Sequence, residues 1–241
     1  MKVSDIVINK INRFKSGYVF TYDDFNIPVN NIGALKMALN RLVNSGKIIR
    51  LSKGQFYKPE ITEFGVLRPP EYQVVKDLLE DNGITIGYLT GVSAFNKLAL
   101  TTQLSNTIQI GTNIDRKSRK RGKFNIRFIR QKNTITKDII YLLQILDSIR
   151  FIKKIPDSDV TISYIRIRIL IKNLSKNEKE MIAKLALKYN PGTRALTGSI
   201  LDQVAESDIT DKLLGSLNPV SVFSYNIIGD ITLDKEKWRI V

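Results

Sequence analysis

Two kinds of side chain in this sequence could carry chemistry: closely spaced carboxylates and dense groups of cations. Asp157 and Asp159 are separated by a single serine, a spacing that could hold a divalent metal ion. The pair also follows Pro156 and precedes a helical segment, where Ser and Asp commonly cap a helix. Helix capping is the preferred interpretation, so we expect neither a metal site nor a cofactor.

The sequence lacks two residue types on which many active sites depend. Its 241 residues include no histidine and no cysteine. This excludes Cys- or His-ligated zinc, cysteine nucleophiles, Ser-His-Asp triads and histidine general bases. The phosphate-binding patterns GxGxxG and GxxxxGK[ST] are also absent. We therefore expect a protein that is not an enzyme, with a carboxylate- and metal-dependent nucleic-acid enzyme as a minor alternative.

The cations are numerous and unevenly distributed. Lys and Arg total 38 against 23 Asp and Glu, a net charge of +15, and residues 1–132 carry +12 of it. Such an excess predicts a polyanionic partner, and nucleic acid is favoured over a membrane because no basic amphipathic helix carries exposed Trp and Phe. A lysine-rich organism would also produce part of this bias.

The densest group of cations lies in residues 116–123, where six of eight residues are basic. The group connects two predicted strands, 106–111 and 124–129, whose apolar residues alternate. So much charge is expected to face water or an anion. The candidate nucleic-acid contacts here are Arg116, Lys117, Arg119, Lys120 and Arg121. A merely solvated loop is the alternative.

The first sixty residues predict a recognisable order of elements. A helix over 4–14 is followed by a short helix over 22–25 and by a third helix that Asn30 or Asn31 caps and Gly46 ends. The third helix has one apolar stripe, which runs from Ile32 to Val43 at helical spacing. A hairpin of strands 47–51 and 55–58 comes next. This is the order of a winged helix-turn-helix domain.

In that fold the third helix enters the major groove of DNA. Asparagine can pair with adenine and arginine with guanine, while lysines contact phosphates. The candidate contacts on the third helix and the hairpin are Asn31, Lys36, Asn40, Arg41, Arg50, Lys53 and Lys58. The alternative is an ordinary solvated face, or a winged helix that binds only protein.

The proline-rich segment 59–70 predicts a domain boundary, which gives a DNA-binding domain at 1–62 and a second domain at 63–241. The second domain is predicted to be mixed α/β with a helical carboxyl-terminal half, so the predicted fold class of the chain is α+β. No apolar run is long enough to span a membrane, and the start lacks the apolar core of a signal peptide. A soluble, cytoplasmic protein is expected.

Two sequence motifs resemble those of a known family. The hairpin follows the pattern GxxxRLxxGxFYxP, from Gly46 to Pro59, and the segment from Gly87 to Gln103 reads GYLTGVSAFNKLALTTQ. Both are similar to AbiEi-type antitoxins, which belong to the type IV toxin–antitoxin systems of bacterial abortive infection. The resemblance covers roughly residues 1–130. The chain has Ala99 where this stretch more often has glycine.

The resemblance implies a repressor that binds inverted repeats in double-stranded DNA of its own promoter. It also implies that the chain counters a nucleotidyltransferase-type toxin without requiring a stable complex with it. Reasoning from the residues alone leaves open an alternative, in which the carboxyl-terminal domain of a winged-helix regulator senses a small ligand.

Overall fold

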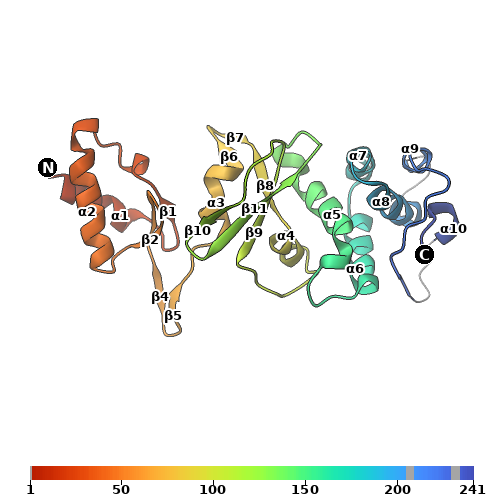
Figure 1. Ribbon diagram of the computed structural model, residues 1–241, viewed down its shortest axis with the longest axis horizontal. Coiled ribbons are helices and arrows are strands. Elements are labelled where there is room, and N and C mark those ends of the chain that lie inside the picture. The colour runs from red at the N-terminus through yellow and green to blue at the C-terminus, as the bar shows by residue number, and fades with distance from the viewer. Residues whose placement is uncertain (1, 205–208, 229–233) are drawn as a thin grey trace. The chain divides into compact units, whose positions relative to one another are not determined.

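The computed structural model of the chain describes residues 2–204, 209–228 and 234–241. It is a mixed α+β protein, as the sequence predicts (Figure 1). Contacts divide the chain into two compact units. Unit 1 comprises Met1–Asp77 and Arg119–Asn125, and unit 2 comprises Leu78–Ser118 and Ile126–Val241. No helix within the described ranges is long and apolar enough to cross a bilayer.

Unit 1 begins with helix α1 (Val3–Arg13), followed by the short strand β1 (Val19–Phe20) and the 3₁₀ helices η1 (Asp23–Phe25) and η2 (Val29–Asn31). Helix α2 (Ile32–Asn44) is followed two residues later by Gly46, whose φ of +71° is the left-handed conformation typical of a helix end. Strands β2 (Ile49–Ser52) and β3 (Gln55–Tyr57) form the expected hairpin, and β1 joins β3 to give a three-stranded sheet.

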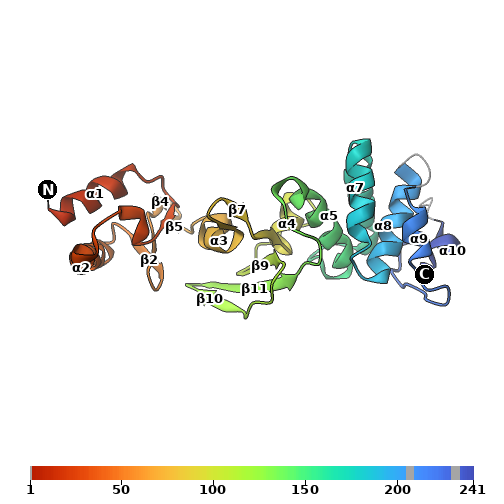
Figure 2. The same ribbon diagram turned by 90° about the horizontal axis from the view of Figure 1, so that it is seen from above.

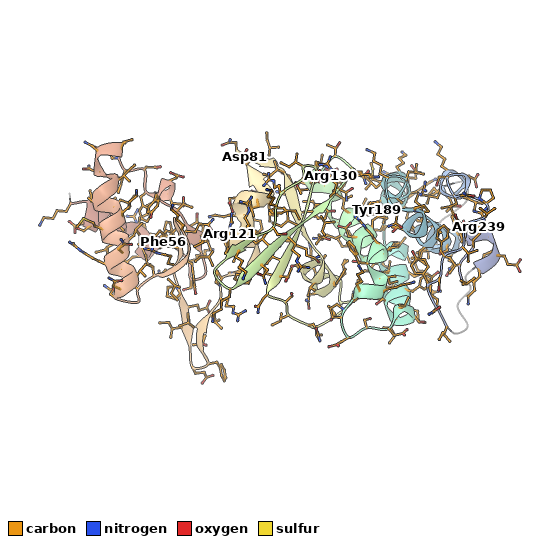
Figure 3. The ribbon with its side chains drawn as sticks, viewed as in Figure 1. Phe56, Asp81, Arg121, Arg130, Tyr189 and Arg239 are labelled. Atoms are coloured by element: carbon orange, nitrogen blue, oxygen red, sulfur yellow. The ribbon has the colours of Figure 1, made fainter. Side chains whose placement is uncertain are left out.

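The predicted apolar stripe of α2 forms the core of unit 1. Leu35, Ala38, Leu39 and Leu42 are buried and pack with Val7 and Ile11 of α1. Aromatic rings complete this core: Phe20 lies 6.0 Å from Phe56 and 5.0 Å from Phe14, measured between ring centroids. Phe56 lies inside the unit (Figure 3). This packing fixes which face of α2 points to solvent.

Residues 59–70 are more ordered than a linker. They form the hairpin of β4 (Glu60–Thr62) and β5 (Gly65–Leu67), and then α3 (Glu71–Leu79) begins after Pro69-Pro70. The expected boundary between 62 and 63 falls inside this hairpin. The prolines flank the two strands rather than interrupt them, and strands of three residues are too short to show a period. Whether residues 1–62 are a domain by themselves stays a prediction.

Unit 2 contains antiparallel strands β8 (Gly87–Thr90) and β9 (Thr107–Thr112), with β11 (Phe124–Arg130) next to β9. Helix α4 (Val92–Lys97) follows β8, and the small strands β6 (Glu80–Asp81) and β7 (Ile84–Thr85) precede it. The first two residues of β11 belong to unit 1, as does β10 (Arg119–Arg121), which is the neighbour of β11 on its other side.

The carboxyl-terminal half of unit 2 is helical, as expected. Its elements are η3 (Lys137–Ile139), α5 (Ile140–Arg150), η4 (Ile152–Lys154), α6 (Val160–Lys172), α7 (Lys176–Ala186), α8 (Pro191–Val204), α9 (Asp211–Gly215) and α10 (Lys235–Trp238). Helix α8 contacts α5, α6, α7, α9 and α10, and Figure 2 shows α7 and α8 side by side. Its centre is therefore buried on every side, including the polar Thr193, Thr197 and Ser199.

Candidate nucleic-acid interface

The solvent face of α2 carries the side chains that the sequence analysis assigned to it. Lys36, Asn40 and Arg41 are exposed, together with Met37 and with Asn31 at the start of the helix. The ammonium group of Lys36 lies 5.8 Å from the centre of the Tyr22 ring, a cation–π contact. A helix with one buried stripe and this opposite face can present amide and guanidinium groups to a partner.

The β2–β3 hairpin places Arg50 next to this face. A guanidinium nitrogen of Arg50 lies 2.5 Å from Oδ1 of Asn40, and its carbon lies 5.4 Å from the centre of the Phe56 ring. Lys53 is exposed at the tip of the hairpin, before Gly54. Gly54 has a φ of +77°, a conformation that favours glycine, and so allows the tight turn. The hairpin and the helix face therefore form one basic surface, which we call the α2–hairpin surface: Asn31, Lys36, Asn40, Arg41, Arg50 and Lys53.

Lys58 has a different position from the one expected. Its ammonium group donates hydrogen bonds to the backbone carbonyls of Asn12 (3.0 Å) and Phe14 (2.9 Å). Those carbonyls belong to the last turn of α1, where a cation satisfies backbone acceptors and the helix dipole. Lys58 therefore caps the carboxyl-terminal end of α1, and we leave it out of the α2–hairpin surface.

The basic segment 116–123 is not a uniformly exposed loop. Arg121 is only 7% exposed, and its guanidinium forms a two-point ion pair with Asp77, with N–O distances of 2.5 and 2.6 Å. It also donates to the carbonyl of Val74 at 2.7 Å, so that it lies against α3 (Figure 3). The prediction that Arg121 faces water or nucleic acid is wrong, because one bidentate carboxylate neutralises the buried cation.

The remaining cations of the segment lie at its surface. Lys117, Arg119 and Lys120 are exposed, and Arg116 is half-buried with its guanidinium 5.9 Å from the Phe128 ring. Lys120 and Arg121 are neighbours on β10, and side chains alternate along a strand, so one faces solvent and the other faces α3. The segment therefore contains a short strand, Arg119–Arg121, and has one buried cation and several exposed ones.

A cavity of about 350 Å³ lies within unit 1 beside the hairpin. Its apolar wall includes Leu51, Tyr57 and Phe124, and three cations line it: Arg50, Arg68 and Lys123. Burial raises the pKa of Tyr57, so its hydroxyl stays protonated. The cavity extends the positive surface beyond α2 and offers an apolar pocket beside it.

The carboxylates that could have formed a catalytic site have structural partners. Asp159 accepts a hydrogen bond of 2.6 Å from the backbone N–H of Thr161 and caps α6, which confirms the capping interpretation. Asp157 accepts one from Gln103. Asp202 accepts hydrogen bonds from Thr210 and from the Trp238 indole. Among the described residues, no cluster of three or more acidic side chains could hold a metal ion.

A buried polar cluster in unit 2 was not foreseen. The carboxylate of Asp147 accepts hydrogen bonds from the hydroxyls of Tyr88 (2.7 Å), Thr90 (2.7 Å) and Tyr189 (3.0 Å). Burial raises the pKa of Asp147, and this effect is larger than the opposite effect of the three hydrogen bonds, so the pKa lies above its ordinary value. The available signal was the acidic residue inside the mostly apolar stretch YLLQILDSI. The Gly87–Gln103 segment supplies two of the three donors, so that its hydroxyls serve packing here.

Comparison with known proteins gives the family and a fold relative. The chain is similar in fold to the RV2827C protein from Mycobacterium tuberculosis, with a TM-score of 0.63 and 13% identity, covering 98% of this chain and 90% of that one. At this identity the likeness concerns the fold alone. No curated protein sequence matches the chain. A model of a family of unknown function, DUF6088, matches residues 6–182. The chain therefore belongs to the DUF6088 family.

Proposed function

We propose that this protein is a DNA-binding transcriptional regulator whose amino-terminal segment is a winged helix-turn-helix domain. The order α1, η1, α2 and the β2–β3 hairpin supports this proposal, as does the sheet that β1 completes. In this assignment α2 is the recognition helix and the hairpin is the wing.

The observation that carries the proposal is the α2–hairpin surface. It combines two exposed amides and exposed cations on a helix whose opposite side is fixed by a closed core. Amide and guanidinium groups can read base edges, and lysines can hold phosphates. The net charge of +15 adds a long-range attraction for a polyanion.

The resemblance to AbiEi-type antitoxins suggests the biological role. We propose a cytoplasmic autorepressor that binds inverted repeats in its own promoter and counters a nucleotidyltransferase-type toxin. In this role the chain is not an enzyme, has no membrane partner, and needs no stable complex with the toxin. The DNA-binding part of the proposal is independent of the toxin part, since it depends on residues of unit 1 alone.

Fluorescence anisotropy with the full chain tests the DNA-binding proposal. The probes are a duplex from the region upstream of the gene and a shuffled duplex of the same composition. We expect the upstream duplex to bind more tightly, and we expect Arg41→Ala together with Arg50→Ala to weaken that binding at least tenfold. Lys172→Ala, an exposed cation in unit 2, is the matched control. Equal weakening by the control, or no binding at 50 mM salt, would refute the proposal.

A second candidate function is a winged-helix regulator whose second domain senses a small ligand. A cation-lined cavity in unit 2, around Arg194, favours this candidate. A ligand that changes the affinity of the chain for its upstream duplex would support it.

A further inference from the structure

Unit 2 contains a cavity of about 480 Å³ that no part of the proposed DNA-binding function uses. Its wall carries five cations: Arg130, Lys132, Arg150, Lys188 and Arg194. No acidic side chain of the residues that the structure describes lines it. A cavity of this size is typical of a small-molecule site.

Separate elements bring these cations together. Arg130 ends β11, and Lys132 follows two residues later. Arg150 ends α5, Lys188 lies between α7 and α8, and Arg194 lies in the first turn of α8. Figure 3 labels two residues of this wall, Arg130 at the end of β11 and Tyr189 between α7 and α8. Convergence of cations from four elements is costly in mutual repulsion unless an anion offsets it.

Among the described residues, one carboxyl group interacts electrostatically with these cations: Arg150 lowers the pKa of the nearby Asp147. No carboxylate of the described residues lies within ion-pair distance of any of them. Nε of Arg194 is buried and has no hydrogen-bond partner. A buried N–H group without a partner costs free energy that a bound acceptor would recover. Arg194 is therefore held in the wall at a cost in free energy.

Two uncharged residues of the wall, Tyr189 and Asn190, are held in place by hydrogen bonds. The hydroxyl of Tyr189 donates to Asp147 and accepts from the side-chain amide of Gln131 at 2.8 Å. Burial raises the pKa of Tyr189, so this hydroxyl remains neutral. Asn190 accepts from the backbone N–H of Thr193 and caps the start of α8, whose dipole adds positive potential at the cavity.

We propose that this cavity binds a small ligand with two or three linked phosphate groups, such as the di- or triphosphate moiety of a nucleotide. Five cations exceed what a single phosphate needs, and linked phosphates carry the matching charge. The concave shape favours a small ligand. The backbone of a duplex would instead need an extended groove or ridge on the protein surface. This inference does not depend on DNA binding by unit 1.

Isothermal titration calorimetry of the full chain tests the proposal with four probes: inorganic triphosphate, ATP, adenosine and orthophosphate. We expect triphosphate and ATP to bind, orthophosphate to bind much more weakly, and adenosine not to bind. ATP binding more tightly than triphosphate would identify a nucleotide as the source of the phosphates, and equal affinities would identify the phosphate chain alone.

Variants locate the site. Arg194→Ala should weaken triphosphate binding about tenfold or more, the worth of one charge-assisted contact. If that variant fails to fold, Arg130→Ala together with Lys188→Ala serves instead, because both side chains are exposed. Lys172→Ala is again the control. Unchanged affinity in both variants, absence of binding by triphosphate and ATP at millimolar concentration, or displacement of triphosphate by duplex DNA would overturn the proposal.

The same variants separate this inference from the DNA-binding proposal. Arg41→Ala with Arg50→Ala should leave triphosphate affinity unchanged, and Arg194→Ala should leave the affinity for duplex DNA unchanged in the absence of triphosphate.

Discussion

The guanidinium of Arg50 donates a hydrogen bond to Oδ1 of Asn40, and this contact joins the β2–β3 hairpin to the exposed face of α2. One of the two lone pairs of Asn40 Oδ1 is therefore already engaged. An asparagine that pairs with adenine uses both its oxygen and its amide N–H. Arg50 thus orients the amide of Asn40 and has to share or release it when a base is bound.

Replacing Asn40 and Arg41 together by alanine should relax sequence preference and leave the fold intact, because both side chains are exposed. A bidentate base contact contributes about 1–3 kcal/mol of discrimination. The measurement is the ratio of affinities for the promoter repeat and a random duplex. A double variant that retains the full ratio would remove both residues from the base contacts, and a large fall in melting temperature would mean that they stabilise the fold.

Lys53 should contact phosphate without reading sequence, since it lies at the exposed tip of the hairpin. Lys53→Ala is expected to weaken binding to all duplexes alike and to reduce the slope of log K against log salt by about one. Titrations between about 50 and 200 mM salt measure this slope. A variant with an unaltered slope would exclude the contact.

The two neighbouring cations of β10 should respond differently to substitution. Arg121→Ser leaves Asp77 and the Val74 carbonyl without their donor and should lower the free energy of unfolding by about 1–3 kcal/mol, since Asp77 is partly exposed to water. Lys120→Ser should change it by less than about 0.5 kcal/mol. Urea unfolding of the two variants measures the contrast. Equal stabilities would show that the Arg121–Asp77 pair is not important for folding.

Asp147→Asn should destabilise the chain by about 1–3 kcal/mol, because an amide cannot accept all three hydroxyl hydrogen bonds. The loss should depend on pH. Burial raises the pKa of Asp147 above its ordinary value of 3.8, so the folded state holds the proton longer than the unfolded state. Wild-type stability then falls as pH rises from 3.8 through the raised pKa.

The asparagine variant has no such titration, so the stability difference from wild type should be largest at acid pH and should narrow as pH rises. Unfolding free energies measured across this range give the difference directly. A difference that stays constant would indicate that the pKa of Asp147 is not raised.

Ala99→Gly should stabilise the chain. Ala99 follows the end of α4 with a φ of +55°, and its N–H and that of Leu100 bond to Asn96 and Phe95 in the pattern of a helix C-cap. A left-handed conformation costs alanine about 1–2 kcal/mol, and the greater freedom of glycine in the unfolded chain returns part of that. The net gain should be about 0.5–1 kcal/mol in thermal unfolding. Ala34→Gly, on an exposed face of α2, should have the opposite sign.

Local patterns predicted the elements of residues 2–58 well, although they missed the β4–β5 hairpin that follows. The stripe Leu35, Ala38, Leu39 and Leu42 alone determines the buried side of α2, and Gly46 marks its end. Such features depend on residues within one or two turns of each other. The exposure of Asn40 and Arg41 follows from the same stripe, so this half of the candidate site was accessible from the sequence.

Contacts between distant residues were not accessible in this way. Arg121 can be buried because it pairs with Asp77. Asp77 lies 44 positions earlier in the chain, and no local sequence pattern links the two residues. The partners of Asp147 come from β8 and from Tyr189 between α7 and α8, more than 40 positions away in each direction. The cavity around Arg194 was missed for the same reason, since four separate elements build its wall.

The division of unit 1 into two segments has a consequence for the order of events during synthesis. A ribosome adds residues from the amino terminus at about 5–20 per second. Residues 2–77 emerge first, but the segment Arg119–Asn125 that supplies the partner of Asp77 follows only after all of residues 78–118. The amino-terminal part of unit 1 therefore lacks β10 until residues 78–118, which belong to unit 2, have already left the ribosome. We infer that unit 1 completes its native contacts late, and that Asp77 stays without Arg121 until then.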